Sequence, residues 1–220
     1  MKAITDSRKY IKNYPIDPSK EPDRFAVMSG NNNYRSGRIA SFDQLKMLKK
    51  KYGIKRVINL ALDSMSDQND PDRSCGGHKN PCEGKWAKEL GLDYYTAYMG
   101  ASPPKPDQWE IIKDMLAKGN TLIHCTWGVD RTGSVAGAWR KSIEPDLTND
   151  QVIEYTYSFG GQWRHAGDPN HKLRDFILAT TYDPALRKRV NFSMNKHLYV
   201  FGGLAVLMLG GATYYRFKVQ

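Results

Sequence analysis

One ten-residue segment limits what this chain can fold into more than any other part of it. Residues 124 to 133 read His-Cys-Thr-Trp-Gly-Val-Asp-Arg-Thr-Gly. A short apolar run, Thr121 to Ile123, precedes the segment, and a stretch suited to a helix, Thr132 to Lys141, follows it. The order of strand, glycine-containing loop and helix is typical of α/β domains.

The loop between this strand and this helix has the composition of an anion-binding site. Its backbone N–H groups can point into one concavity at a helix N-terminus, which attracts a tetrahedral anion. Cys125 then lies at the bottom of the concavity, and Arg131 can clamp two phosphate oxygens in its planar fork. The same positive surroundings favour the thiolate, which is the nucleophilic form of cysteine. Gly128 and Gly133 suit a tight turn and a close approach of helix to strand.

The segment resembles the signature loop of the cysteine-dependent protein tyrosine phosphatase superfamily. The motif Tyr34-Arg-Ser-Gly-Arg38, followed by Ile54 to Leu60, resembles the beginning of its atypical dual-specificity branch. The resemblance implies an α/β fold with a central, mostly parallel sheet flanked by helices. It also implies hydrolysis of phosphate monoesters through a phosphocysteine intermediate, which requires no metal and no cofactor.

The resemblance assigns roles within the loop. Cys125 would be the nucleophile, and the Thr132 hydroxyl would hydrogen-bond its sulfur and help it leave in the second step. We expect His124 to organise the loop rather than to exchange protons. The residues expected to bind the substrate phosphate are Thr126, Trp127, Gly128, Val129 and Arg131.

The general acid has two candidates. Many members of the superfamily use an aspartate from the loop that joins the preceding strand to the preceding helix. In this chain that loop is residues 100 to 106, before the predicted helix Gln108 to Lys118, and it contains no carboxylate. Asp107 is the first carboxylate residue after this loop, and its spacing to Glu110 predicts a helix-capping role. Asp130 lies inside the loop, at a place where some related phosphatases also carry aspartate. We therefore expect Asp130 to be the acid, with Asp107 as the alternative.

Charge and loop composition leave the substrate open. The formal net charge of +10 favours an anionic partner: a phosphorylated substrate, an acidic membrane surface or nucleic acid. Lipid phosphatases that act on multiply phosphorylated headgroups often carry lysines in this loop. This loop has none and therefore does not require a highly charged headgroup, so a phosphoprotein and a phosphoinositide both fit. The family branch also includes inositol polyphosphate and pyrophosphate phosphatases. The loop resembles the RNA 5′-triphosphatase of capping enzymes as well, but Trp127 and Asp130 replace its His and Asn. The presence of both Cys125 and Arg131 argues against the alternative that the protein is a catalytically dead phosphate-binding adaptor.

The end of the chain departs from the polar average. Residues 198 to 215 contain no charged residue in 18 positions. A helix of this length approaches a hydrocarbon core of about 30 Å, and tyrosines lie near both of its ends. Basic residues are more numerous before the stretch than after it, which predicts a single-pass C-terminal anchor with the catalytic domain in the cytosol. The alternative is a buried core helix or hairpin, because two Gly-Gly pairs lower the helix propensity.

The polar stretch from Asp63 to Gly84 is predicted to be a surface loop. It contains Cys75, His78 and Cys82, but no fourth ligand is close and the spacing matches no strong zinc pattern. Three cysteines in total, with no apolar N-terminal segment, favour a reduced cytosolic setting.

Local signals delimit the remaining elements and the domains. We expect residues 1 to 30 to form an arm on the domain outside its core, 31 to 190 the phosphatase domain, 191 to 197 a basic linker and 198 to 215 the anchor. The predicted helices are Ser41 to Gly53, Lys85 to Leu90, Gln108 to Lys118, Thr148 to Tyr157, and two that begin at Asp168-Pro169 and Asp183-Pro184; the predicted strands are Lys55 to Leu60 and Asp93 to Met99.

Overall fold

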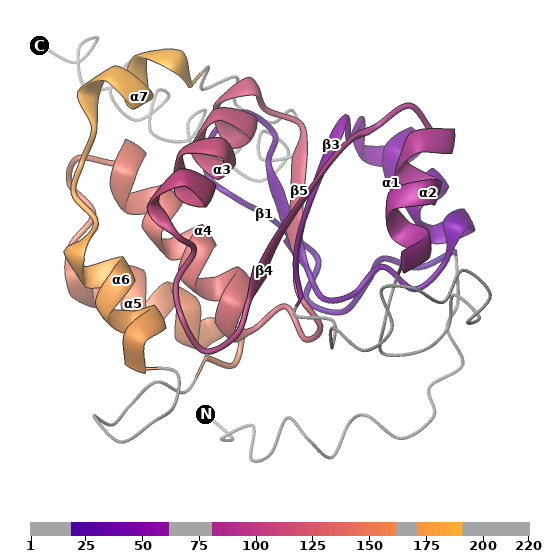
Figure 1. Cartoon of the computed structure of the whole chain (residues 1–220). Coiled ribbons are helices and arrows are strands. Elements are labelled where there is room, and N and C mark those ends of the chain that lie inside the picture. Colours follow the sequence, from indigo (N-terminus) through magenta and orange to yellow (C-terminus); the bar gives the residue numbers. More distant parts are fainter. Residues whose placement is uncertain (1–18, 62–80, 162–170, 191–220) are drawn as a thin grey trace, which may run out of the picture. The chain divides into compact units, whose positions relative to one another are not determined.

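The computed structural model describes residues 19–61, 81–161 and 171–190 of the chain. Its centre is a five-stranded sheet with helices on both faces (Figure 1). The strands are β1 (Ala26–Val27), β2 (Tyr34–Ser36), β3 (Arg56–Ala61), β4 (Asp93–Met99) and β5 (Thr121–His124). The helices are α1 (Phe42–Tyr52), α2 (Pro81–Glu89), α3 (Pro106–Lys118), α4 (Asp130–Ile143), α5 (Asn149–Ser158), α6 (His171–Ala179) and α7 (Pro184–Arg189).

The sheet has the order β1-β2-β5-β3-β4, and all neighbours except β1 and β2 are parallel. The predicted mostly parallel sheet is therefore confirmed. His124, the last residue of β5, pairs with Ser36 of β2 on one side and with Asn59 of β3 on the other. The carboxyl ends of three parallel strands thus meet around the residue that follows His124, which is the usual position of a ligand site in an open α/β sheet.

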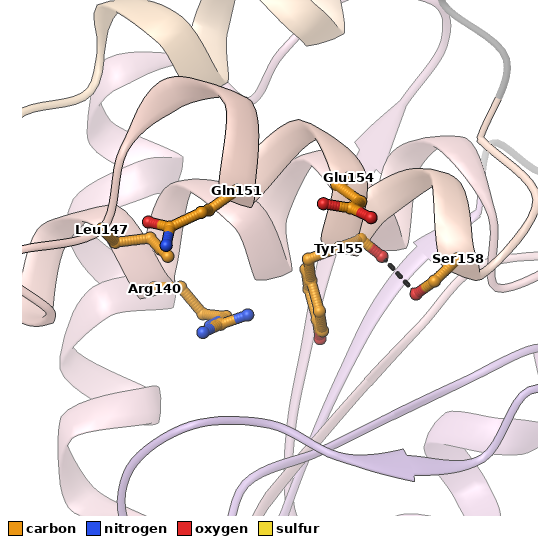
Figure 2. Close-up of a pocket in the computed structure, with 6 residues that line it drawn as sticks. All are labelled: Arg140, Leu147, Gln151, Glu154, Tyr155 and Ser158. Carbon is orange, nitrogen blue, oxygen red and sulfur yellow. Dashed lines mark hydrogen bonds between the residues drawn. The ribbon is translucent and has the colours of Figure 1, made fainter.

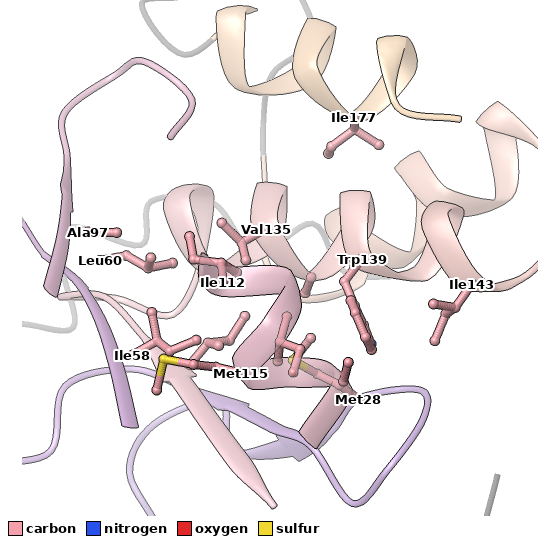
Figure 3. Close-up of a cluster of buried hydrophobic side chains, with 14 of the residues drawn as sticks. Met28, Ile58, Leu60, Ala97, Ile112, Met115, Val135, Trp139, Ile143 and Ile177 are labelled. Atoms are coloured by element: carbon pink, nitrogen blue, oxygen red, sulfur yellow. The ribbon is translucent and has the colours of Figure 1, made fainter. Parts of the chain in front are cut away.

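Two apolar cores cover the two faces of the sheet. The larger one joins the sheet to α3, α4, α5, α6 and α7, and Figure 3 shows part of it, including Met28, Trp139 and Ile143. The Trp139 ring is fully buried, and its Nε1 donates to the Ser29 carbonyl at 2.8 Å. The smaller core lies under α1 and α2 and includes Leu45 and Leu48. Burial on both faces agrees with the apolar sequence of the parallel strands.

Several predicted helix ends are confirmed. The Ser41 hydroxyl accepts the Gln44 N–H at the start of α1, and Gly53 ends this helix with a φ of 66°. Thr148 and Gln151 form the capping box of α5, and the Asp183 side chain caps α7. These ends were predictable because each depends on residues within three or four positions of the cap.

Three predictions were wrong. The first thirty residues do not all lie outside the core, since β1 pairs with β2 and Met28 is buried. The stretch from Asp63 to Gly84 is not loop throughout, because α2 begins at Pro81. Finally, α3 begins at Pro106 with Lys105 as its N-cap residue, and the Gln108 side chain accepts the Lys105 N–H at 2.9 Å, so Asp107 does not cap it.

None of the described helices has the length and apolar character needed to cross a bilayer. Residues 191 to 197 and 198 to 215, the predicted linker and anchor, lie outside the described residues, as do Cys75, His78 and the Asp168-Pro169 helix start.

Candidate active site

The predicted loop is present and joins β5 to α4. We call residues Cys125 to Arg131 the phosphate-binding loop. Cys125 follows β5 directly, is a free thiol and is only 1% exposed. Val129 is the N-cap residue of α4, and Asp130 is its first residue. The positive end of the α4 dipole therefore lies at the loop, as the sequence predicts.

Gly128 is the one residue of the phosphate-binding loop with a positive φ. Its φ is 66°, and a Cβ atom on it would lie 2.6 Å from the Gly37 nitrogen and 2.7 Å from the Ser36 carbonyl carbon. Real Cβ contacts do not occur at such distances, and the left-handed conformation itself disfavours other residues. Glycine is therefore required here by both conformation and space.

Two hydrogen bonds hold the Arg131 guanidinium between the end of β4 and the phosphate-binding loop. Its Nη1 donates to the Met99 carbonyl at the end of β4, and its Nη2 donates to the Thr126 hydroxyl, both at 3.2 Å. These bonds hold the planar fork beside the loop that carries Cys125. A guanidinium at this place can bind two oxygens of a phosphate group.

The Thr132 side chain is fully buried under the loop. Its hydroxyl lies 3.5 Å from the Ser36 carbonyl, which it faces as a donor. Among the described residues this is its hydrogen-bond partner, so the bond to the Cys125 sulfur expected from the resemblance is absent.

His124 forms a buried pair with Glu83 of α2. Its Nε2 lies 2.6 Å from Glu83 Oε1, and both side chains are at most 1% exposed. The pair ties the residue before Cys125 to a helix on the other face of the sheet. That His124 organises the loop stays a prediction, since Glu83 is not a residue of the loop. The sequence did not reveal Glu83, because we predicted that stretch to be a loop.

The two acid candidates lie on different helices. Asp130 is partly buried in the first turn of α4, next to Arg131. Asp107 is exposed in the first turn of α3, and its negative charge acts on Tyr95 of β4. Burial, together with this charge, raises the pKa of Tyr95. Asp107 thus lies beside β4 rather than in the phosphate-binding loop.

The N-terminal motif that resembles the atypical branch packs directly against the phosphate-binding loop. Arg35 is fully buried, and its Nη2 donates to the Gly128 carbonyl at 2.6 Å. Arg24, which no sequence pattern marked, donates from Nη1 to the Trp127 carbonyl at 3.1 Å. The Arg38 N–H donates to the Thr126 carbonyl at 3.3 Å.

Among residues 19–61, 81–161 and 171–190, no group of three His, Cys, Asp or Glu side chains is arranged to hold a metal ion. A shallow depression lies elsewhere, between the end of α4 and α5 (Figure 2). There the Arg140 guanidinium binds both carboxylate oxygens of Glu144, at 2.8 and 2.7 Å, and this bond raises the pKa of Arg140. No residue of the phosphate-binding loop lines the depression, whose lining residues are Arg140, Leu147, Gln151, Glu154, Tyr155 and Ser158.

The same architecture occurs in solved cysteine-dependent phosphatases. The core catalytic domain of the PP-IP phosphatase SIW14 from S. cerevisiae has a TM-score of 0.53 and 17% identity, over 77% of this chain and 92% of that one. P. aeruginosa TpbA in complex with pTyr has a TM-score of 0.51 and 16% identity, over 80% and 93%. Kinase-associated phosphatase with its catalytic-site cysteine replaced by serine has a TM-score of 0.54 and 13% identity, over 72% and 93%.

This chain therefore has the fold of cysteine-dependent phosphatases, which confirms the fold expected from its signature segment. No family model matches the chain, and no curated protein matches it in sequence.

Proposed function

We propose that the protein is a cysteine-dependent phosphatase that hydrolyses phosphate monoesters through a phosphocysteine intermediate. The observation that carries the proposal is the position of a free, buried Cys125 between the carboxyl end of β5 and the N-terminus of α4, with the Arg131 fork held across the same loop. A thiolate nucleophile, a planar cation and inward backbone N–H groups are the parts that a phosphoryl group in transfer requires.

The reaction has two steps. The Cys125 thiolate attacks phosphorus, the bond between phosphorus and the ester oxygen breaks, and an acid gives a proton to the leaving oxygen. Water then attacks the phosphocysteine, the same acid now takes a proton from this water, and the sulfur leaves as thiolate. Arg131 and the backbone N–H groups of the loop bind the non-bridging oxygens in both steps.

We assign the acid role to Asp130, with Asp107 as the alternative. The position of Asp130 in the loop beside Arg131 supports the assignment. Asp130→Asn lowers kcat/KM for phenyl phosphate about 100-fold or more, because kcat/KM reports the first step, in which phenolate is a poor leaving group that needs the proton. The loss is much smaller with p-nitrophenyl phosphate, whose leaving group needs little protonation. Asp107→Asn is the matched control; if it shows this pattern and Asp130→Asn does not, Asp107 is the acid.

A phosphoprotein or a phosphoinositide is the proposed substrate, with an inositol polyphosphate or pyrophosphate as the alternative. The pTyr complex of TpbA and the PP-IP phosphatase SIW14, which share the fold, support testing both classes. Release of phosphate from a phosphotyrosine peptide, a phosphoserine peptide, phosphoinositide vesicles, an inositol pyrophosphate and a triphosphate-ended RNA ranks them by kcat/KM. A rate highest on the RNA contradicts the proposal.

Residues 198 to 215 are proposed to anchor the protein in a membrane, with the catalytic domain on the cytosolic side. The uncharged length and the basic residues before it support this. In a vesicle flotation assay the full chain floats with the lipid. Leu207→Arg places a charge in the middle of the stretch, at a cost of about 3 kcal/mol to insertion, and reduces the floating fraction. Equal flotation of the two chains contradicts the anchor.

A further inference from the structure

Three successive carbonyl groups of the phosphate-binding loop accept hydrogen bonds from one N-terminal stretch, residues 24 to 38. This stretch contains β1 and β2 and lies beside the loop, because β2 pairs with β5. Two of the three donors are arginine side chains. The bonds run from Arg38 N to Thr126 O at 3.3 Å, from Arg24 Nη1 to Trp127 O at 3.1 Å, and from Arg35 Nη2 to Gly128 O at 2.6 Å.

These bonds determine which way the N–H groups of the loop point. The C=O and N–H of one trans peptide group point in opposite directions, since the group is planar. Holding the carbonyls of residues 126 to 128 toward the N-terminal stretch therefore turns the N–H groups of Trp127, Gly128 and Val129 to the other side. In the described part of the chain these three N–H groups donate to no other residue. They remain available for the oxygens of an anion.

The buried position of the Arg35 guanidinium is unfavourable for the free energy of folding. The guanidinium is fully buried, and its Nε and Nη1 have no hydrogen-bond partner among the described residues. The guanidinium carbon lies 3.8 Å from the centre of the Phe159 ring and 5.6 Å from that of Tyr155, so aromatic faces replace a carboxylate partner. A buried cation without a counter-charge is unfavourable. A phosphate dianion in the adjacent loop would supply that counter-charge.

Arg24 connects the loop to the end of α5 as well. While its Nη1 binds the Trp127 carbonyl, its Nε donates to the Phe159 carbonyl at 3.1 Å. Phe159 is also the residue whose ring covers the Arg35 guanidinium. The two arginines and Phe159 therefore form one connected support behind the phosphate-binding loop.

We propose that Arg24 and Arg35 are positioning residues for the proposed phosphatase reaction: they hold the Trp127 and Gly128 carbonyls outward so that the loop N–H groups face the phosphate. Neither arginine touches the substrate in this account. The inference rests on the proposed function, because it explains how the phosphate-binding loop is kept ready for an oxyanion.

The test is the affinity of the full-length protein for tungstate, a phosphate-shaped anion, measured by calorimetry. Arg35→Met and Arg24→Met each weaken tungstate binding about tenfold or more, because misdirected N–H donors no longer reach the anion. kcat for p-nitrophenyl phosphate falls as well, since the same donors stabilise the transition state. Arg35→Lys recovers part of the lost affinity, because its ammonium group keeps a donor for the Gly128 carbonyl and a cation for the Phe159 ring.

Arg56 provides the matched control. It is also a strand arginine of this sheet that donates to a backbone carbonyl, with its Nη1 2.7 Å from Gly119 O, but it lies at the start of β3, away from the loop. Arg56→Met lowers the melting temperature while tungstate affinity stays within twofold of the wild type. This variant separates a loss of stability from a loss of loop orientation.

The outcomes are distinct. An Arg35→Met protein that is folded and binds tungstate within twofold of the wild type overturns the inference. If this variant does not fold, Arg24→Met decides by the same criterion, since the Arg24 side chain is only partly buried. A wild-type protein that binds tungstate but hydrolyses no ester contradicts the proposed function, while the arginine comparison can still be made from the tungstate affinities.

Discussion

Gly128 shows how closely the N-terminal motif and the phosphate-binding loop are packed. The backbone of Ser36 and Gly37 occupies the space that any side chain at position 128 would need. The same contact lets the Arg35 guanidinium reach the Gly128 carbonyl. A single glycine thus allows both the turn of the loop and its attachment to β2.

Gly128→Ala is predicted to distort the loop. The left-handed conformation costs about 1 to 2 kcal/mol for alanine, and the overlap with the Gly37 backbone adds roughly 1 to 3 kcal/mol. Gly53→Ala is the matched control, since Gly53 has the same φ of 66° with nothing within 4 Å of the added atom. Urea unfolding is expected to show the larger loss for Gly128→Ala, with a fall of about 100-fold in kcat/KM. Equal losses of stability in the two variants contradict the packing argument.

The sequence predicted the phosphate-binding loop between β5 and α4 but not the residues that contact it from other parts of the chain. Cys125, Asp130 and Arg131 are within one short segment, so local order suffices to place them together. Arg24 and Arg35 act from about a hundred positions away, and only the pairing of β2 with β5 brings them to the loop. The Tyr34–Arg38 motif marked this region as a resemblance without indicating what it contacts.

The carboxylate of Glu21, which precedes β1, binds two residues at the end of α1. Glu21 accepts a hydrogen bond from Lys51 Nζ at 2.6 Å and another from the Tyr52 hydroxyl. The bond from Lys51 is the larger cause, and together they lower the pKa of Glu21 from its ordinary 4.5 to about 2. Because the folded pKa is depressed, this pairing stabilises the fold above about pH 4.5 and is lost as the pH falls toward 2.

Glu21→Gln is therefore predicted to lower the melting temperature by a few degrees at pH 7. The difference from the wild type narrows as the pH falls from 4.5 toward 2, where the wild-type carboxylate also becomes neutral. Thermal melts at a series of pH values check this. Glu110→Gln removes the same charge from an exposed helix position and serves as control. A difference that does not depend on pH contradicts the assignment to this carboxylate.

Helices and strands were predictable from the sequence where local chemistry determines their limits. The caps at Ser41, Thr148 and Asp183 and the stop at Gly53 belong to this group. β1 was missed because two residues carry little pattern and form a strand only through pairing with β2. The start of α3 was misplaced because an aspartate two residues inside the helix resembles a cap, whereas Lys105 takes that position and Gln108 supplies the reciprocal bond.

The phosphate-binding loop lies at the carboxyl edge of the sheet, where it contacts several elements of the described fold. β2 and β3 flank β5, and β4 pairs with β3. Two of these strands contribute to the surroundings of the loop: Arg35 and Ser36 come from β2, and the Met99 carbonyl comes from β4. From the opposite face, α2 contributes Glu83 to the residue before the nucleophile. Helices from both faces of the sheet therefore contact the segment that carries the thiol and the guanidinium.

In the proposed reaction, Cys125 attacks phosphorus. The most direct measurement is hydrolysis of p-nitrophenyl phosphate by the full-length wild type and by Cys125→Ser, with orthovanadate as inhibitor and tungstate affinity measured in parallel. We predict vanadate-sensitive turnover in the wild type, a loss of at least about 1,000-fold in kcat for Cys125→Ser, and little change in tungstate affinity. Turnover by Cys125→Ser at a rate close to that of the wild type would contradict the account.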